Sequence, residues 1–170
     1  MNDIIKEKAS KIKLLAFDVD GVMTTGEVTY DENGVEYKSF NVKDGHGLVR
    51  VQKAGFITAI ITARNNGTVK HRAENLHITE LYQGQKYKLP ALEEIMQKYN
   101  LTYEQVSYMG DDLPDLCILE KVGLKCCPND AVDEVKSICN FISTKDGGKG
   151  AVRELTDLIL EAQGIKKECT

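Results

Sequence analysis

The chain has 170 residues, of which 42% are hydrophobic and 28% charged, as is typical of one globular domain with a substantial core. Its formal net charge is −4 and it has no basic block, which argues against a nucleic-acid-binding surface. No apolar run approaches the roughly 18 residues that a membrane-spanning helix needs, and the polar N-terminus has no signal-peptide pattern, so we expect a cytoplasmic protein without membrane contact.

Strands and helices alternate along the predicted chain. The apolar run 13–17 predicts a strand buried on both faces, and strand-like runs at 27–30 and 36–40 flank Asn33-Gly34, a hairpin signal. The remaining elements expected, in chain order, are a helix over 45–54, a strand over 56–62, a helix over 68–76, a strand over 80–82, a helix over 89–99, a strand over 106–109, a helix over 113–122, a strand over 123–127, a helix over 131–138, a strand over 140–143 and a helix over 151–162. This alternation predicts an α/β fold, a doubly wound, Rossmann-like parallel sheet in a single domain over 1–170, with the hairpin (about 24–40) inserted after the first strand.

Polar side chains follow the carboxyl ends of the predicted strands, where ligands bind in open parallel sheets. They are Asp18 and Asp20 after the first strand, Thr62 and Arg64 after the strand 56–62, and Asp111, Asp112 and Asp115 after the strand 106–109, with Lys88 just before the helix 89–99. Acids from two strands therefore converge with a hydroxyl group and with cations.

Such a convergence predicts phosphoryl chemistry. Clustered carboxylates raise each other's pKa unless a cation compensates, and oxygen ligands without a His/Cys set favour Mg²⁺. A carboxylate beside the metal, here Asp18, can attack phosphorus, while Lys88 and Thr62 hold the phosphoryl oxygens. Asp20 lies two residues further along an extended segment, so it points the same way and can protonate the leaving oxygen.

Four segments resemble the motifs of the haloacid dehalogenase-like phosphatases. These are DVDGV at 18–22, IIT ending at Thr62, Lys88, and GDDLPD at 110–115, in that order over nearly the whole chain. The resemblance implies that Asp18 is the nucleophile and Asp20 the general acid and base. It also implies that Asp18, the backbone carbonyl of Asp20 and Asp111 hold Mg²⁺, with support from Asp112 or Asp115.

Further segments resemble the 3-deoxy-D-manno-octulosonate 8-phosphate phosphatases. They are Asp44-Gly-His-Gly, Tyr82-Gln-Gly-Gln, the glycine-rich segment 147–154 and the hairpin. The resemblance implies Mg²⁺-dependent hydrolysis of that sugar phosphate, feeding lipopolysaccharide synthesis, with substrate contacts from Arg64, Gly147, Gly148 and Lys149. Two positions depart from the family pattern, because Ala63 stands where glycine is usual and Lys149 where arginine is common.

The resemblance also implies a homotetramer in which the hairpins form a small barrel and a neighbouring subunit helps to cover each site. The residues themselves point to an assembly, since one subunit is not expected to bury Val28, Tyr30, Val35 and Tyr37 of the hairpin. Five cysteines occur, without a Cys-x-x-Cys pair, so we expect reduced and mostly structural thiols.

Three alternatives stay open. A phosphatase for a nine-carbon 2-keto-3-deoxy sugar acid 9-phosphate would use the same motifs, although the relatives with that substrate carry an acidic residue at the position of Arg64. A phospho-acceptor switch of the receiver type also combines acids, a Thr and a Lys, but it places its acid pair and its phosphorylated Asp on different strands. A catalytically silent binding domain would keep the fold without turnover.

Overall fold

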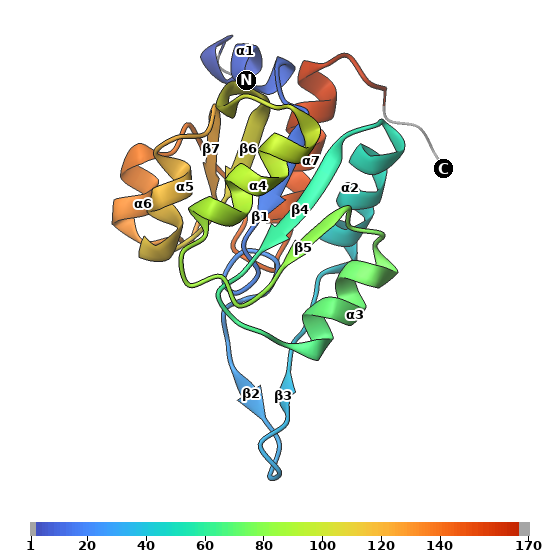
Figure 1. The fold of residues 1–170 in the computed structure, drawn as a ribbon, viewed down its shortest axis with the longest axis vertical. Coiled ribbons are helices and arrows are strands. Elements are labelled where there is room, and N and C mark those ends of the chain that lie inside the picture. The colour runs from blue at the N-terminus through green and yellow to red at the C-terminus, as the bar shows by residue number, and fades with distance from the viewer. Residues whose placement is uncertain (1–2, 167–170) are drawn as a thin grey trace.

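The computed structural model describes residues 3–166, with a six-stranded sheet at its centre (Figure 1). Its strands, in spatial order, are β5 (Glu80–Tyr82), β4 (Ile57–Ile61), β1 (Leu14–Phe17), β6 (Val106–Met109), β7 (Leu124–Cys127) and β8 (Phe141–Ile142). Every neighbouring pair is parallel. The predicted α/β fold with a parallel sheet is confirmed.

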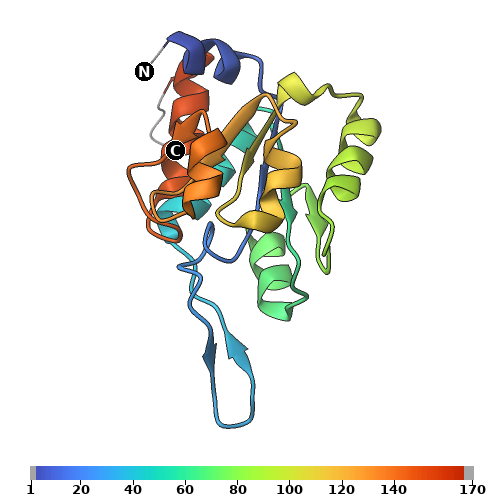
Figure 2. The ribbon, with the colours of Figure 1, turned by 90° about the vertical axis from the view of Figure 1, so that its left-hand side faces the viewer.

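Helices cover both faces of this sheet (Figure 2). They are α1 (Asp3–Ser10), α2 (Val42–Lys53), α3 (Gly67–Asn75), α4 (Leu89–Tyr99), α5 (Leu116–Leu119), α6 (Asp133–Ile138) and α7 (Ala151–Ala162), with the 3₁₀ helices η1 (Tyr103–Gln105) and η2 (Leu113–Asp115). Leu15 and Phe17 of β1 pack with α1, α2, α3 and α7, whereas Leu14 and Ala16 pack with α4, α5 and α6. The continuous apolar sequence of β1 follows from this burial on both faces. Within residues 3–166, no helix is both long enough and apolar enough to span a bilayer.

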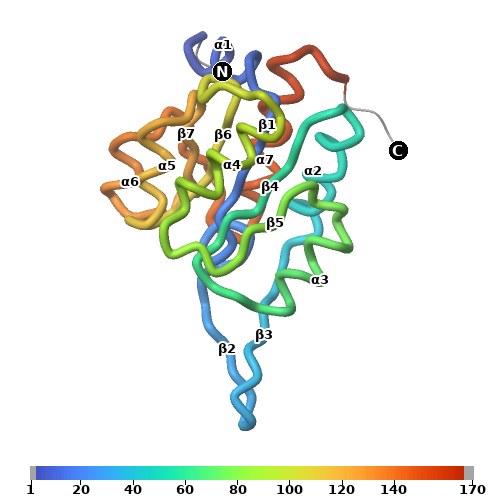
Figure 3. Tube along the Cα trace, in the orientation of Figure 1, coloured from blue at the N-terminus to red at the C-terminus, as the bar shows by residue number. Residues whose placement is uncertain are grey.

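The hairpin projects away from the sheet and its helices, as Figures 1 and 2 show. Its strands β2 (Thr29–Tyr30) and β3 (Glu36–Tyr37) are antiparallel, and the ladder is shorter than the sequence predicts. The carboxylate of Asp31 accepts the backbone N–H groups of Asn33 and Val35, each at 2.9 Å, and so closes the turn. In the trace of Figure 3 one arm joins the loop that follows β1 and the other leads to α2. Lys38 at the base of the second arm donates to Asp20, so this base lies near the end of β1.

Other elements also differ from the sequence prediction, among them three helical segments. No element is predicted before residue 13, yet α1 forms there and buries Ala9 in the core. Helix α2 begins at Val42, three residues before the predicted start, because the Asn41 side chain accepts the N–H of Lys43 and caps the helix. In place of the helix predicted over 113–122, the structure has a 3₁₀ turn, capped by the Asp112 side chain, and then α5, which ends at Leu119.

Candidate active site

A cavity of about 280 Å³ opens between the loops that follow β1, β4 and β6. Eight predicted site residues line it: Asp18, Asp20, Thr62, Arg64, Lys88, Asp111, Asp112 and Asp115. The residues that follow β1 and those that follow β6 lie close together, because these two strands are neighbours in the sheet. At their ends the N–H of Asp18 donates to the carbonyl of Met109 at 3.0 Å. The carboxyl edge of the sheet is therefore the candidate site.

Lys88 links two of the carboxylates in this cavity. Its Nζ lies 3.0 Å from Asp18 Oδ1 and 2.7 Å from Asp115 Oδ1, and its side chain is 2% exposed. Burial opposes a charge on Lys88, but the carboxylates of Asp18 and Asp115 raise its pKa above the ordinary value. A fixed cation thus lies beside Asp18, where it can stabilise negative charge on a phosphoryl group.

Asp115 is held by four hydrogen bonds. Its Oδ1 accepts from Lys88 Nζ and from the hydroxyl of Tyr108, both at 2.7 Å. Its Oδ2 accepts from the backbone N–H groups of Asp111 at 3.0 Å and Asp112 at 3.4 Å. The carboxylate oxygens of Asp115, Asp18 and Asp111 lie within 4.8 Å of one another, but these four donors use the acceptor capacity of Asp115. Asp115 therefore fits a supporting role better than that of a metal ligand.

Tyr108 is a site residue that the sequence prediction missed. It is completely buried in β6, and its hydroxyl donates to Asp115. Burial and the nearby carboxylate of Asp115 raise the pKa of Tyr108 well above its ordinary value, so it stays a donor. A tyrosine within a fully buried strand could have been noticed, because a buried phenol needs a hydrogen-bond partner.

Asp111 and Asp18 fit a divalent cation. Asp111 Oδ1 is buried and has no hydrogen-bond partner in the described part of the chain. Burial and the charge of Asp18 raise the pKa of Asp111 to about 8, and burial and the charge of Asp115 raise the pKa of Asp18 to about 6. A hard cation such as Mg²⁺ would take the free oxygen and offset this repulsion, so the residues present fit the predicted metal.

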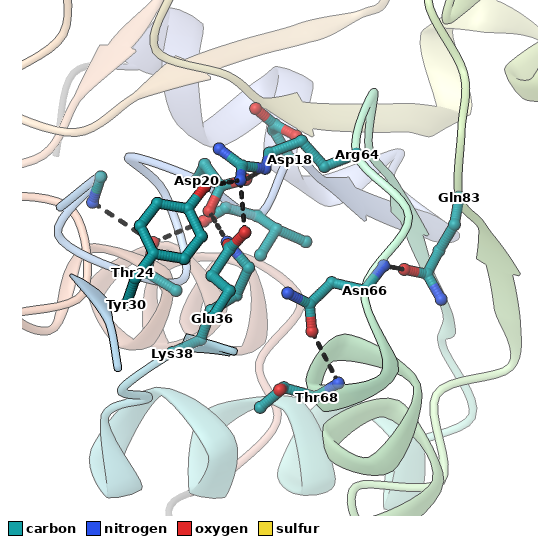
Figure 4. Close-up of polar contacts among 12 residues, drawn as sticks. Asp18, Asp20, Thr24, Tyr30, Glu36, Lys38, Arg64, Asn66, Thr68 and Gln83 are labelled. Carbon is teal, nitrogen blue, oxygen red and sulfur yellow. Dashed lines mark hydrogen bonds and ion pairs between the residues drawn. The ribbon is translucent and has the colours of Figure 1, made fainter. Parts of the chain in front are cut away.

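Thr62 reaches the cavity from the end of β4. Its N–H donates to the carbonyl of Tyr82, and its carbonyl accepts the N–H of Gln85, each at 2.9 Å. The loop that follows is anchored at Asn66, whose N–H donates to Gln83 Oε1 and whose side chain accepts the N–H of Thr68, both at 2.8 Å (Figure 4). These bonds fix the backbone on either side of Arg64.

Asp20 and Arg64 belong to an ion network with the hairpin (Figure 4). Lys38 Nζ donates to Asp20 Oδ1 and lies 2.8 Å from Glu36 Oε1. The Arg64 guanidinium donates to Glu36 Oε2, lies 3.5 Å from the hydroxyl of Tyr30, and has its Nε 3.9 Å from Asp20 Oδ2. The sequence prediction missed Glu36 and Lys38, although their spacing of two on a strand puts both side chains on one face.

The glycine-rich segment packs behind the loop that follows β1. A Cβ at Gly147 would lie 1.8 Å from the carbonyl oxygen of Gly21, and the N–H of Gly148 donates to the carbonyl of Val22 at 2.9 Å. Lys149 is mostly exposed, with its Nζ 3.9 Å from Asp146. The structure therefore brings Gly147 and Gly148 to the backbone of that loop. The three residues are not among those that line the cavity, and their contact with a substrate stays a prediction.

Gly21 lets the loop after β1 approach the candidate metal site. Its φ is +83°, a region that favours glycine, and a Cβ there would lie 2.0 Å from Asp111 Oδ2. Any side chain at this position would displace the Asp111 carboxylate.

Known proteins are similar to this chain in sequence and in fold. A family described as haloacid dehalogenase-like hydrolase matches residues 74–155. The 3-deoxy-D-manno-octulosonate 8-phosphate phosphatase KdsC of Escherichia coli (strain K12) is 43% identical over 157 residues, which cover 92% of this chain and 84% of the relative. The chain belongs to this phosphatase family. The family predicted from the motifs is confirmed.

Solved structures of the family superpose closely on the chain. The 3-deoxy-D-manno-octulosonate 8-phosphate phosphatase from Yersinia pestis has a TM-score of 0.95 at 41% identity, covering 97% of this chain and 89% of its own. The phosphatase from Moraxella catarrhalis, solved with a magnesium ion, a phosphate ion and a KDO molecule, has a TM-score of 0.94 at 40% identity, covering 96% and 94%. The family fold extends over nearly all of the chain.

Without Mg²⁺, raising the pH is expected to destabilise this family member. A carboxyl with a higher pKa in the folded than in the unfolded chain stabilises the fold at low pH, and that stabilisation is lost as the pH rises through the interval between the two values. For Asp111 the interval runs from 3.8 to about 8. We expect the Tm in EDTA to fall by several degrees between about pH 5 and about pH 8, which corresponds to a loss on the order of 2 kcal/mol in the free energy of unfolding. Mg²⁺ should restore most of this loss.

The control for this titration is Asp111→Asn, which keeps the shape of the side chain but has no proton to lose. Its Tm in EDTA should change less over the same pH range. A fall in Tm equal to that of the wild type would assign the pH dependence to other groups.

Proposed function

We propose that the chain is a Mg²⁺-dependent phosphomonoesterase that hydrolyses 3-deoxy-D-manno-octulosonate 8-phosphate to the free sugar acid and phosphate. The observation that carries this proposal is the meeting, in one cavity, of the Asp18 carboxylate, the buried Lys88 ammonium 3.0 Å away and the unpartnered oxygen of Asp111. The identity to the Escherichia coli phosphatase and the likeness to the Moraxella catarrhalis complex support the same reaction.

The first half of the reaction transfers the phosphoryl group to the protein. Asp18 attacks phosphorus, the bond between phosphorus and the sugar oxygen breaks, and Asp20 gives that oxygen a proton. Lys88 and Thr62 hold the phosphoryl oxygens while charge develops on them. Mg²⁺, held by Asp18, Asp111 and the backbone carbonyl of Asp20, would offset the charge of the phosphoryl group and the carboxylates.

The second half releases phosphate. Asp20, now a carboxylate, takes a proton from water, and the water oxygen attacks the phosphorus of the aspartyl-phosphate. The bond between phosphorus and Asp18 breaks, which regenerates the free carboxylate. Asp112 and Asp115 support this site in the proposal, Asp115 by holding Lys88 and Asp112 by capping η2.

A phosphate-release assay with and without Mg²⁺ tests the proposal on the eight-carbon and nine-carbon sugar acid phosphates. We expect kcat/KM at least about tenfold higher for the eight-carbon substrate, and activity only with Mg²⁺. Faster release from the nine-carbon substrate would overturn the choice of substrate. A stable phosphoenzyme without turnover would indicate a phospho-acceptor switch, and no reaction at all would indicate a silent binding domain.

We also propose that the hairpins form the interface of a homotetramer. Val28, Tyr30, Val35 and Tyr37 are 47%, 57%, 53% and 55% exposed, and such an apolar cluster is typical of an interaction surface. We expect a tetramer by light scattering at micromolar concentration, and smaller species for Val35→Lys, because a charge at that surface opposes burial. The matched control is Val42→Lys, which is 81% exposed outside the hairpin and should stay assembled. A monomeric wild type would refute the interface.

Finally, we propose that the chain acts in the cytoplasm and that its product enters lipopolysaccharide synthesis. Cys117, Cys126, Cys127 and Cys139 are free thiols, which is typical of a reducing compartment. Cys169 lies outside the described residues.

A further inference from the structure

Lys38 reaches from the hairpin back to the candidate site. It follows β3 at the base of the hairpin, yet its side chain is only 2% exposed. Its ammonium donates to Asp20 Oδ1 and lies 2.8 Å from Glu36 Oε1, and the contacts of all three side chains are drawn in Figure 4. None of the four family motifs contains Lys38 or Glu36.

The ammonium is held in one place by these two carboxylates. A buried ammonium is costly unless it is paired, and here Lys38 donates a hydrogen bond to Asp20 and forms an ion pair with Glu36. Although burial opposes the charge, Asp20 and Glu36 raise the pKa of Lys38 above its ordinary value, so it remains a cation. Glu36 is fixed in turn, because its other oxygen accepts from Arg64.

These bonds restrain the Asp20 carboxylate through one oxygen. Oδ1 accepts a hydrogen bond from Lys38, whereas Oδ2 lies 3.9 Å from the Arg64 Nε, beyond hydrogen-bond distance. Asp20 lines the cavity, so a restrained carboxylate with one oxygen available is suited to proton transfer. General acid catalysis requires the acid within hydrogen-bond reach of the leaving atom, and side-chain disorder at Asp20 would lower the population of such geometries.

We propose that Lys38 is a positioning residue, anchored by Glu36, that orients the carboxylate of Asp20 for protonation of the leaving oxygen. The inference rests on the proposed function, in which Asp20 is the general acid. It gives the base of the hairpin a part in the chemistry, in addition to any part in assembly.

The test compares two aryl phosphates of similar shape, phenyl phosphate and p-nitrophenyl phosphate, with the variant Lys38→Met. Phenolate is a poor leaving group that needs the proton of the general acid, whereas p-nitrophenolate leaves without it. Neither substrate has a carboxylate, so loss of a contact to a sugar acid does not enter the comparison. We measure kcat/KM, because it reports the steps up to phosphoryl transfer and not the later hydrolysis.

We expect Lys38→Met to lower kcat/KM for phenyl phosphate by about 10- to 100-fold and that for p-nitrophenyl phosphate by less than about threefold, since general acid catalysis contributes about 10²–10⁴-fold. Lys38→Arg should recover part of the loss, because a guanidinium can donate to both carboxylates. Lys53→Met, the same change at an exposed position at the end of α2, should leave both values unchanged.

An equal loss for both aryl phosphates would overturn the inference, as would no loss for either. If Lys38→Met does not fold, Glu36→Gln takes its place, because this variant removes the anchor and keeps Lys38. A larger loss of kcat/KM for phenyl phosphate than for p-nitrophenyl phosphate is again expected. An equal loss for both substrates would overturn the inference. Failure of the wild type to hydrolyse any sugar phosphate would instead overturn the proposed function.

Discussion

Asp18→Asn is expected to abolish phosphate release, with kcat lowered by at least about 10⁴-fold. The amide is close in shape to the carboxylate but cannot attack phosphorus, so no aspartyl-phosphate forms. The variant should fold with an unchanged or higher Tm at neutral pH. The reason is that burial and Asp115 raise the pKa of Asp18 to about 6, so the ionised carboxylate is itself destabilising in the metal-free protein.

Two measurements separate this outcome from a general loss of function. Mass spectrometry after quenching with acid should detect a phosphorylated peptide containing residue 18 in the wild type and none in Asp18→Asn. The matched control is Asp112→Asn, because Asp112 is exposed at the rim and its carboxylate caps the N–H of Leu113. It should keep activity within about tenfold of the wild type. Activity of Asp18→Asn in that same range would place the nucleophile elsewhere.

The sequence allowed the sheet and the loops that carry the site to be predicted, because both follow from local patterns. A strand buried on both faces, such as Leu14–Phe17, must be apolar throughout, and the change to Asp18 marks the end of the strand at the cavity. Parallel strands end at one edge, so residues distant in the sequence, such as Thr62 and Asp111, could be placed together before the structure was known.

The contacts around the site could not be predicted in the same way, because they depend on where side chains from separate elements meet. The sequence left Asp112 and Asp115 equivalent, and only the approach of Lys88 and Tyr108 distinguishes them. The sequence analysis does not single out Lys38, which lies in the predicted hairpin strand over 36–40. Its burial follows from the path of the hairpin arm beside the loop after β1, which no periodicity encodes.

The glycine-rich segment shows a further limit of sequence patterns. The resemblance implies that Gly147, Gly148 and Lys149 contact the substrate, and this contact stays a prediction. In the structure the N–H of Gly147 donates to Asp130 Oδ1 at 2.9 Å, and a Cβ there would meet the Gly21 carbonyl. Close approach of two backbones also requires glycine, and composition alone does not distinguish this requirement from contact with a substrate.

Asp115→Ala is expected to cause the largest loss of stability of any single substitution in the site, about 3–5 kcal/mol. The change leaves the buried Lys88 ammonium beside Asp18 alone and removes the acceptor of the Tyr108 hydroxyl. The substitution also leaves the backbone N–H groups of Asp111 and Asp112 without their acceptor, the Asp115 carboxylate. A loss of this size corresponds to a fall in Tm of about 10 °C for a chain of this length. Tyr108→Phe, which removes only one of these hydrogen bonds, should lose about 1 kcal/mol.

The double variant Asp115→Ala/Lys88→Met distinguishes the cause of that loss. If an uncompensated buried charge on Lys88 dominates, removing the charge as well should restore about 1–2 kcal/mol relative to Asp115→Ala, because a buried ion pair is replaced by apolar groups. Phosphate release should be abolished in the double variant, since Lys88 is needed to hold the phosphoryl oxygens. Urea denaturation measures the two free energies. A double variant less stable than Asp115→Ala would mean that Lys88 is still compensated by Asp18 alone, and that the loss comes from the backbone N–H groups and Tyr108.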